Sequence, residues 1–323
     1  MRQASGDDIS SVVLGDKATQ KIIHNSTTSG GSGSSSRSKR RKLHEAVDPA
    51  ITAAIARDPT MALTAEERTW ALSLKEAFQN HEDILACAIT DMEIATYAII
   101  DQGNLERSCE RAICMQAFKM QYNINDTTEE GLYIFRRLHE FCPGLLLSIE
   151  SCPNEDGCGS HALVMDLARY YPLRFLNDPR DFRYNIGAIY YMKLCTQPDF
   201  QSIRDGYRHL CECDGVTWEN ASFKVESRNI DQLLAHMPYR RRLVKCLRVP
   251  SVLLVLYSLM KPFLPKEEYD AFLFGTEDLQ TEFPERIDQF YLQPNMDQAH
   301  KNMIQRCRAL LTRRYYHQRA FRL

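Results

Sequence analysis

The sequence lacks an apolar run long enough to cross a membrane. A bilayer-spanning helix needs about 20 apolar residues, and the longest apolar stretch, 251–261, supplies eleven. The N-terminal residues MRQASGDDIS contain no apolar segment typical of signal peptides, and Asp7 and Asp8 argue against a transit peptide. The eleven cysteines, an odd number, are therefore expected to be reduced thiols of a cytoplasmic protein, with the nucleus as an alternative.

Sequence motifs of several enzyme classes are also absent. The chain has no Gly-rich phosphate-binding loop, no G-x-S-x-G nucleophile elbow and no H-E-x-x-H metal motif. A net charge of −2 over 323 residues gives no overall attraction for nucleic acid. The hydrophobic content of 44% and the charged content of 25% are typical of one large or two ordinary globular domains. We expect no catalytic residue, no cofactor and no nucleic-acid partner.

Residues 1–43 form a tail of low complexity. The segment NSTTSGGSGSSSRSKRRK is rich in Gly and Ser and cannot bury enough apolar surface to offset its chain entropy, which predicts disorder. The tail ends in a basic cluster at 37–42, formed by Arg37 and the run 39–42. Such a cluster is typical of a nuclear-import signal or of an electrostatic tether to anionic membranes. The alternative is a solvated linker.

Two kinds of periodicity divide the rest of the chain. Residues 44–140 show helical patterns, including a capping-box spacing between Thr64 and Glu67 and a break at Gly103. From about residue 141 to 300, short strand-like runs (144–151, 161–170, 206–215 and 241–249) alternate with helical patterns at 180–194, 227–236 and 250–264. This alternation predicts an α/β domain with a largely parallel sheet flanked by helices. A C-terminal helix is expected over 301–323.

A group of cysteines and histidines has metal-like composition but unfavourable spacing. Five residues separate Cys152 from Cys158, and one separates Cys211 from Cys213, whereas zinc sites favour two to four. Buried free cysteines are common core residues. We therefore expect no metal site, and a zinc enzyme or a cysteine-dependent hydrolase is the least favoured alternative. The group consists of Cys152, Cys158, His161, His209, Cys211 and Cys213.

Three consecutive arginines enter the last long strand-like run. Strand alternation places Arg240 and Arg242 on one face and Arg241 on the other. Two guanidinium groups on one face suit bidentate binding of a phosphate or carboxylate. The alternative is a solvated strand end that pairs with Glu226 or Asp231.

The stretch RVPSVLLVLYSLMKPFL, at 248–264, is apolar on every side of the helix that it predicts. A helix that packs on one core needs only a stripe of apolar residues. Either this helix is buried on both faces, or one face covers the core and the other face contacts an apolar partner that can bind and leave.

The segment 237–275, MPYRRRLVKCLRVPSVLLVLYSLMKPFLPKEEYDAFLFG, resembles the C-terminal half of the CRAL-TRIO lipid-binding domain. The shared features are a proline before a strand (Pro238), a proline that opens a mobile helix (Pro250), the element Lys-Pro-Phe-Leu at 261–264 and a strand ending at Gly275. More loosely, NEDGCGSHALVMDL, GYRHLCECDGVTW and GNLERSCERAICMQAF resemble the hairpin, a strand and the N-terminal helical subdomain of tocopherol-transfer and retinaldehyde-binding proteins.

The resemblance implies a gated lipid cavity. In the family, the helix at 250–264 closes the cavity with one face and enters the bilayer with the other, and the positions of Arg240 and Arg242 meet membrane phosphoinositides. The Lys and Glu that hold an inositol head group in the phosphatidylinositol-transfer branch would fall near Asp270 and at Tyr239, so that head group is not expected. The implied gate and cavity residues are Val252, Val255, Leu256, Leu259, Met260, Phe263 and Leu264.

The implied function is non-enzymatic. We expect a monomeric protein, peripheral at membranes, that binds a phospholipid or isoprenoid-type lipid and transfers it between membranes. The alternative is a degenerate relative that keeps the fold, has a filled cavity and acts as an adaptor on membranes or proteins.

Overall fold

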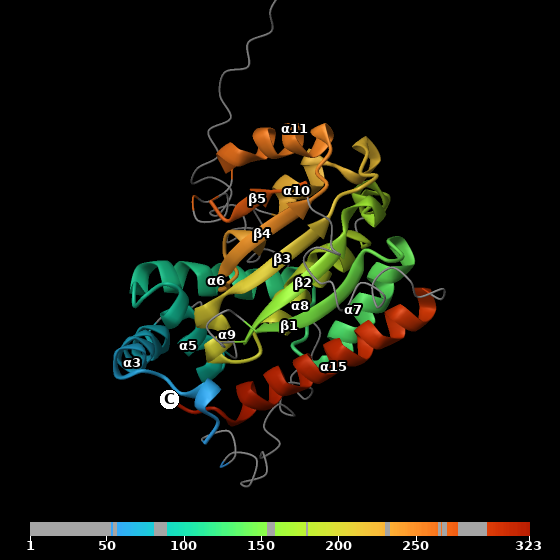
Figure 1. Ribbon diagram of the computed structural model, residues 1–323. Coiled ribbons are helices and arrows are strands. Elements are labelled where there is room, and N and C mark those ends of the chain that lie inside the picture. The colour runs from blue at the N-terminus through green and yellow to red at the C-terminus, as the bar shows by residue number, and fades with distance from the viewer. Residues whose placement is uncertain are drawn as a thin grey trace, which may run out of the picture. The chain divides into compact units, whose positions relative to one another are not determined.

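The computed structural model describes residues 53, 57–80, 89–153, 159–178, 180–229, 233–263, 266, 270–276 and 296–323. These residues belong to a compact unit that runs from Val47 to Leu323. The predicted tail, 1–43, and its basic cluster lie outside the described residues. Within the described part, the architecture is α/β, with a five-stranded sheet flanked by helices (Figure 1).

The N-terminal part is helical, as the periodicity predicts, and its helices begin at polar caps. The Thr64 hydroxyl accepts a hydrogen bond from the Glu67 amide at 3.1 Å, and the Glu67 carboxylate accepts one from the Thr64 amide at 2.9 Å, which confirms the capping box. Gly103 at φ 77° separates two of the helices, a conformation that suits glycine. The elements are η2 (Pro59–Met61), α3 (Ala65–Gln79), α5 (Asp91–Ile100), α6 (Leu105–Gln121) and α7 (Thr128–Phe141).

The sheet has the order β1-β2-β3-β4-β5. The pair β1–β2 is antiparallel, as in a hairpin, whereas β2–β3, β3–β4 and β4–β5 are parallel. The predicted α/β class with a largely parallel sheet is therefore confirmed. A register shift in β4 opposite Tyr207 and Arg208 interrupts strict alternation at Arg241. The strands are β1 (Leu146–Pro153), β2 (Gly159–Asp166), β3 (Tyr207–Glu212), β4 (Arg241–Leu247) and β5 (Phe272–Phe274).

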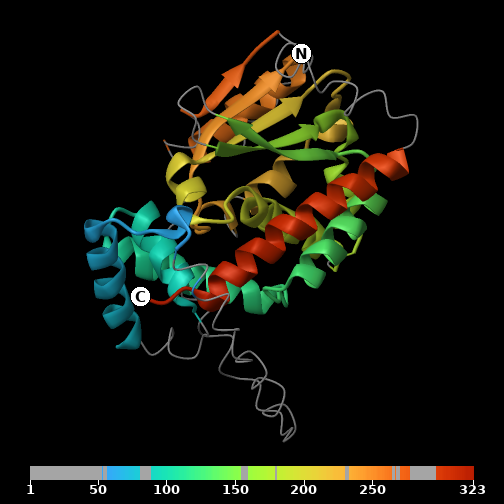
Figure 2. The same cartoon turned by 60° about the horizontal axis from the view of Figure 1, so that its bottom comes forward.

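Helices lie between the parallel strands along the chain. The long helix α15 runs beside α7 and past β1 (Figure 2). In contrast, α11 lies at the β4–β5 end of the sheet (Figure 1). The remaining helices are α8 (Phe182–Thr196), α9 (Phe200–Asp205), α10 (Phe223–Asn229), α11 (Ser251–Met260) and α15 (Met296–Ala320). Short 3-10 helices are η3 (Leu167–Arg169), η4 (Pro172–Leu176), η5 (Trp218–Asn220) and η7 (Lys261–Phe263).

One predicted helix begins earlier than the sequence pattern suggests. The expected range was 227–236, but α10 starts at Phe223. Ser222 explains the start, because its carbonyl accepts a hydrogen bond from Glu226 and its hydroxyl accepts one from the Val225 amide.

The largest of the hydrophobic clusters among the described residues joins the helical region to the sheet. It includes Leu74 of α3, Phe135 of α7, Tyr191 of α8 and Leu311 of α15, all 1% exposed or less. The predicted boundaries at 44–140, 141–300 and 301–323 stay predictions.

Candidate functional site

A cavity of about 270 Å³ lies on one face of the sheet. Its walls come from strands β2 to β5 and from helices α7, α8, α10 and α11, together with residues in or next to η3 and η5. Most lining side chains are apolar, and a smaller group is polar or charged. The apolar and thiol members are Leu138, Leu145, Leu163, Met165, Leu167, Ile189, Met192, Cys211, Ala221, Val244, Cys246, Leu234, Leu253, Leu256, Met260, Phe272 and Phe274.

Strand alternation explains the sheet side of the cavity. Leu163 and Met165 of β2 line the cavity, and so do Cys211 of β3 and Cys246 of β4. Each of these four residues lies two positions from another lining residue on the same strand, so the two side chains point to the same face of the sheet. Their neighbours in sequence, such as Val164, point to the opposite face and belong to a separate cluster. The buried cysteines therefore act as small apolar side chains in the cavity wall.

Helix α11 covers the cavity with one of its two faces. Leu253, Leu256, Tyr257 and Met260 are half-buried and line the cavity. Their spacing of three or four residues places them on the same side of the helix. The sequence pattern, which is apolar all round, gave no indication of which side this would be.

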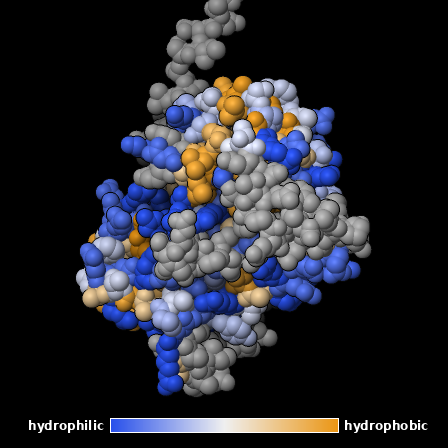
Figure 3. Space-filling view, viewed as in Figure 1, coloured by the Kyte–Doolittle hydropathy of each residue, from blue (hydrophilic) through white to orange (hydrophobic). Residues whose placement is uncertain are grey.

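The opposite face of α11 is apolar and exposed. Leu254, Val255 and Leu259 are 43%, 48% and 55% exposed. Ser258, on the same face, donates its hydroxyl hydrogen to the Leu254 carbonyl, so its side chain is satisfied within the helix. Leu273 of β5 is also exposed. Figure 3 shows apolar residues gathered at the end of the molecule where Figure 1 places α11.

The other predicted gate residues have different positions. Val252 is buried and packs against Cys211, Cys246 and Val244 rather than on the exposed face. The backbone of Phe263 is in η7. Leu264 lies outside the described residues.

The three arginines at the start of β4 separate, and the register shift beside Arg241 puts that residue on the same side as Val244 and Cys246. Arg240 and Arg242 are exposed, and Arg240 donates a hydrogen bond to the Arg204 carbonyl at 3.1 Å. Arg241 instead lines the cavity. An anion site at Arg240 and Arg242 stays a prediction, while Arg241 is a candidate that the sequence analysis did not select.

A basic and aromatic cluster forms one side of the cavity wall. The Lys193 ammonium, on α8, lies 4.2 Å from the ring centroid of Tyr207 and 4.0 Å from that of Tyr239. Arg241 Nε donates to the Tyr207 hydroxyl at 3.2 Å. His209 also lines the cavity, and its burial, with Arg241 and Lys193 close by, holds its pKa well below the usual range. The imidazole is therefore neutral at pH 7.

Sequence reasoning missed Lys193. The signal was a lysine within the apolar helix IGAIYYMKLCT, because lysines are almost never fully buried unless they are paired. Lys193 is 4% exposed.

A second polar cluster is satisfied by its own hydrogen bonds. The Tyr170 hydroxyl donates to Asn185 at 3.1 Å, and the Asn185 amide donates to Asn229 at 3.1 Å. Asn229 donates in turn to Glu226 at 3.4 Å. Burial raises the pKa of Glu226, against the opposing effect of the neighbouring polar groups of Tyr170 and Asn229. This network closes its side of the cavity without an external partner.

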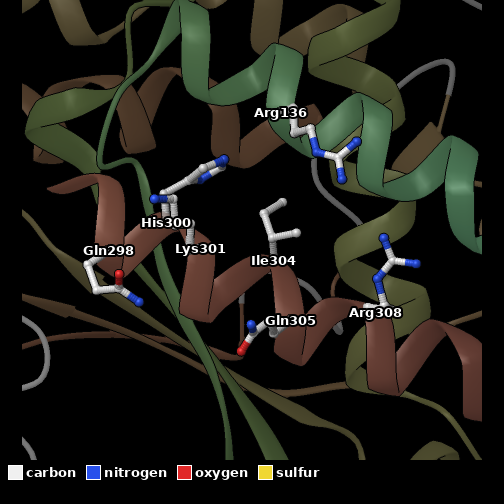
Figure 4. A pocket seen from close by; sticks show the side chains of 7 residues that line it. All are labelled: Arg136, Gln298, His300, Lys301, Ile304, Gln305 and Arg308. Atoms are coloured by element: carbon white, nitrogen blue, oxygen red, sulfur yellow. The ribbon is translucent and has the colours of Figure 1, made fainter.

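A larger hollow of about 380 Å³ lies elsewhere, between α7 and α15. Figure 4 shows its side chains, among which Arg136 and Arg308 extend towards each other to the right of Ile304. Ile304 is its one apolar lining residue, and the others are basic or amides. A hydrophobic ligand gains little from such a surface, so we place the candidate site in the smaller cavity.

The metal and enzyme alternatives gain no support in the part of the chain that the structure describes. No group of three or more His, Cys, Asp or Glu residues there could hold a metal ion. Cys158 lies outside it. Cys307 and Arg313 have the spacing of a cysteine phosphatase, but both lie within α15 and Cys307 is fully buried.

No described helix combines the length and the apolar character needed to cross a membrane.

The chain was also compared with known proteins. No family model matches it, and no curated protein does. Its fold is similar to the crystal structure of Sfh5, with a TM-score of 0.48 and 13% identity over 68% of this chain and 84% of that chain. A similarity with so low a TM-score and sequence identity assigns no function. The predicted CRAL-TRIO membership stays a prediction, whereas the sheet and helix arrangement that it implied is present.

Proposed function

We propose that this protein binds a hydrophobic ligand in the cavity beneath α11 and exchanges it at membrane surfaces, with α11 as the gate. One observation carries the proposal: α11 has Leu256 and Met260 on the cavity and Val255 and Leu259 exposed on its other side. A helix with a purely structural role would not need an apolar outer face.

The physics of exchange accounts for both faces. Each buried methylene contributes about 0.8 kcal/mol, so a ten-carbon chain resists transfer into water by roughly 8 kcal/mol. A gate that opens only in an apolar medium removes most of that barrier. The outer face of α11 supplies this dependence, because inserting Leu254, Val255 and Leu259 into a bilayer stabilises the open state.

The cavity volume limits the ligand. At about 270 Å³, it is slightly smaller than the range of roughly 300–1,000 Å³ that is usual for ligand sites. A single-chain lipid suits this volume, whereas a two-chain phospholipid needs outward movement of α11. The same small volume favours, as a second candidate, an adaptor that docks to membranes through α11 without exchanging lipid.

Two matched double substitutions test the gate, since both have the same spacing on α11. Val255→Asp with Leu259→Asp alters the exposed face, and Leu256→Asp with Met260→Asp alters the cavity face. We expect the outer pair to melt normally while transfer of a fluorescent single-chain lipid between vesicles falls at least about tenfold. The inner pair should lose several kcal/mol of stability, because it buries unpaired charges.

Three outcomes decide between the candidates. Normal transfer by the outer pair would remove the gate proposal. The adaptor candidate predicts a different result for the wild-type protein. It should bind vesicles through the outer face of α11, carry no lipid in native mass spectrometry and transfer none. Unfolding of both variants would identify α11 as a core helix.

A further inference from the structure

We propose that the groove between α7 and α15, the hollow shown in Figure 4, is a docking surface for an acidic peptide segment of a partner protein. The inference goes beyond the proposed lipid exchange, because the groove shares no lining residue with the cavity beneath α11. It follows from the charge of the groove, from the arrangement of its side chains and from its place in the fold.

Positive charge dominates the described side chains that line the groove. Arg136, Lys301 and Arg308 are exposed and line it, and no described carboxylate does. In the part of the chain that the structure describes, Arg136 and Lys301 have no carboxylate within ion-pair distance. Arg308 pairs with Glu129 at 2.7 Å, but the two side chains are 47% and 71% exposed. Such surface pairs contribute little and exchange readily, so a carboxylate of a partner can replace Glu129.

The three cations form two positions along the groove. Arg136 of α7 and Arg308 of α15 extend towards each other across it (Figure 4). Two facing guanidinium groups can bind one carboxylate from both sides, because each offers N–H donors in a planar fork and no acceptor. Lys301 lies seven residues before Arg308, which is about two turns or roughly 10 Å along α15. An extended peptide rises about 3.3 Å per residue, so carboxylates three positions apart would reach both positions.

The remaining lining side chains suit a peptide backbone. The amides of Gln298 and Gln305 can each donate and accept hydrogen bonds, and a peptide backbone needs both kinds of partner. Half-buried Ile304 provides a small apolar floor. Single-stranded nucleic acid is bound with the help of aromatic side chains on which bases stack, and no described Phe, Tyr or Trp lines this groove. The composition therefore favours an acidic peptide over nucleic acid.

The groove and the proposed gate lie at opposite edges of the sheet. Helix α15 packs against α7 and β1, and β1 is one edge strand. Helix α11 lies at the β4–β5 end, and β5 is the other edge strand (Figures 1 and 2). A membrane that contacts the outer face of α11 therefore leaves the groove facing water, where a partner protein can reach it. This placement favours a protein partner over lipid head groups.

A pair of matched peptides tests the charge preference. The probe is a fluorescein-labelled peptide of about six glutamates, long enough to span both cationic positions at roughly 3.3 Å per residue. A glutamine peptide of the same length is its control. We would measure the binding of both to the full-length protein by fluorescence anisotropy at low salt. We expect the glutamate peptide to bind at least about tenfold tighter, and added salt should reduce the difference.

Substitutions locate the binding surface. Arg136→Ala with Lys301→Ala should weaken binding of the glutamate peptide at least about tenfold and leave binding to phosphoinositide vesicles unchanged. Arg240→Ala with Arg242→Ala removes two exposed cations elsewhere and is the matched control, which should bind the peptide like wild type. A second groove variant, Gln305→Glu, keeps every cation and adds a repelling carboxylate in a side chain of nearly the same shape. It should also weaken peptide binding.

Several results would overturn the docking surface. Equal binding of the two peptides would do so, and so would wild-type affinity in both groove variants. An equal loss in the Arg240 and Arg242 variant would assign the attraction to overall charge. Tighter binding of an oligouridylate of the same length, lost on groove substitution, would assign the groove to nucleic acid, and loss of vesicle binding would assign it to the membrane. If the double groove variant does not fold, Gln305→Glu and the two peptides still decide.

Discussion

Tyr257 of α11 packs edge-on against Phe274 of β5, with ring centroids 4.9 Å apart and planes at 71°. The Phe272 ring lies 5.0 Å from the same tyrosine. These rings join the proposed gate to the edge strand of the sheet, next to the cavity that all three residues line. Because aromatic rings make this attachment, α11 can separate from β5 in an apolar medium.

Tyr257→Ala should loosen this attachment. Aromatic pairs contribute about 0.5–1.5 kcal/mol beyond their buried area, so ligand release should accelerate roughly threefold to tenfold. The measurement is the dissociation rate of a fluorescent single-chain lipid into excess acceptor vesicles. Tyr316→Ala, at a 48% exposed site on α15, is the control. Equal rates for both variants would show that the rings do not restrain the gate.

Gate opening should expose two cavity cysteines. Cys211 and Cys246 line the cavity and are 3% and 5% exposed, so N-ethylmaleimide should modify them slowly in solution. With anionic vesicles present, local opening should increase their modification roughly fivefold or more, measured for each site by mass spectrometry. Cys195 and Cys307 are fully buried outside the cavity wall and should not change. A parallel increase at all four would indicate global unfolding instead.

The exposed arginines Arg240 and Arg242 are expected to meet anionic membrane. Each basic side chain near such a surface contributes about 1 kcal/mol, so Arg240→Ala with Arg242→Ala should weaken binding to phosphoinositide vesicles by at least roughly tenfold. Added salt should reduce the difference. The matched control is Arg136→Ala with Lys301→Ala, in the groove between α7 and α15. Wild-type binding by the Arg240 and Arg242 variant at low salt would assign the pair to the solvated strand end.

His209 should make stability dependent on pH. Its pKa is lowered in the folded protein, whereas the unfolded chain has the ordinary value of about 6.5. The unfolded state therefore binds more protons below that pH, and folding stability falls as the pH decreases, by at most about 1.4 kcal/mol per unit.

His209→Gln removes this contribution. We expect urea unfolding at pH 7.5 and 5.5 to show a smaller loss of stability for the variant than for wild type. The comparison is necessary because burial also lowers the pKa of His161 and His317, which act with the same sign. Equal losses in both proteins would show that His209 is protonated without cost.

The sequence by itself determined the local elements of this protein. Thr64 and Glu67 bracket a helix start with groups that bond each other, so a stretch of four residues suffices to predict it. Period-2 apolar patterns separated by helical ones likewise predicted a largely parallel sheet. The all-apolar stretch at 251–260 showed that its helix has two apolar faces. All these signals act over a few residues.

Only the tertiary structure decided how those faces and charges are used. The packing of Tyr257 and Val252 against strands elsewhere in the sequence decides which face of α11 is buried and which is exposed. Similarly, Lys193 and Arg241 are 48 positions apart, and nothing local to either residue indicates the other. In the fold, both side chains lie over the ring of Tyr239 and line the same cavity. Long-range packing therefore determined the site.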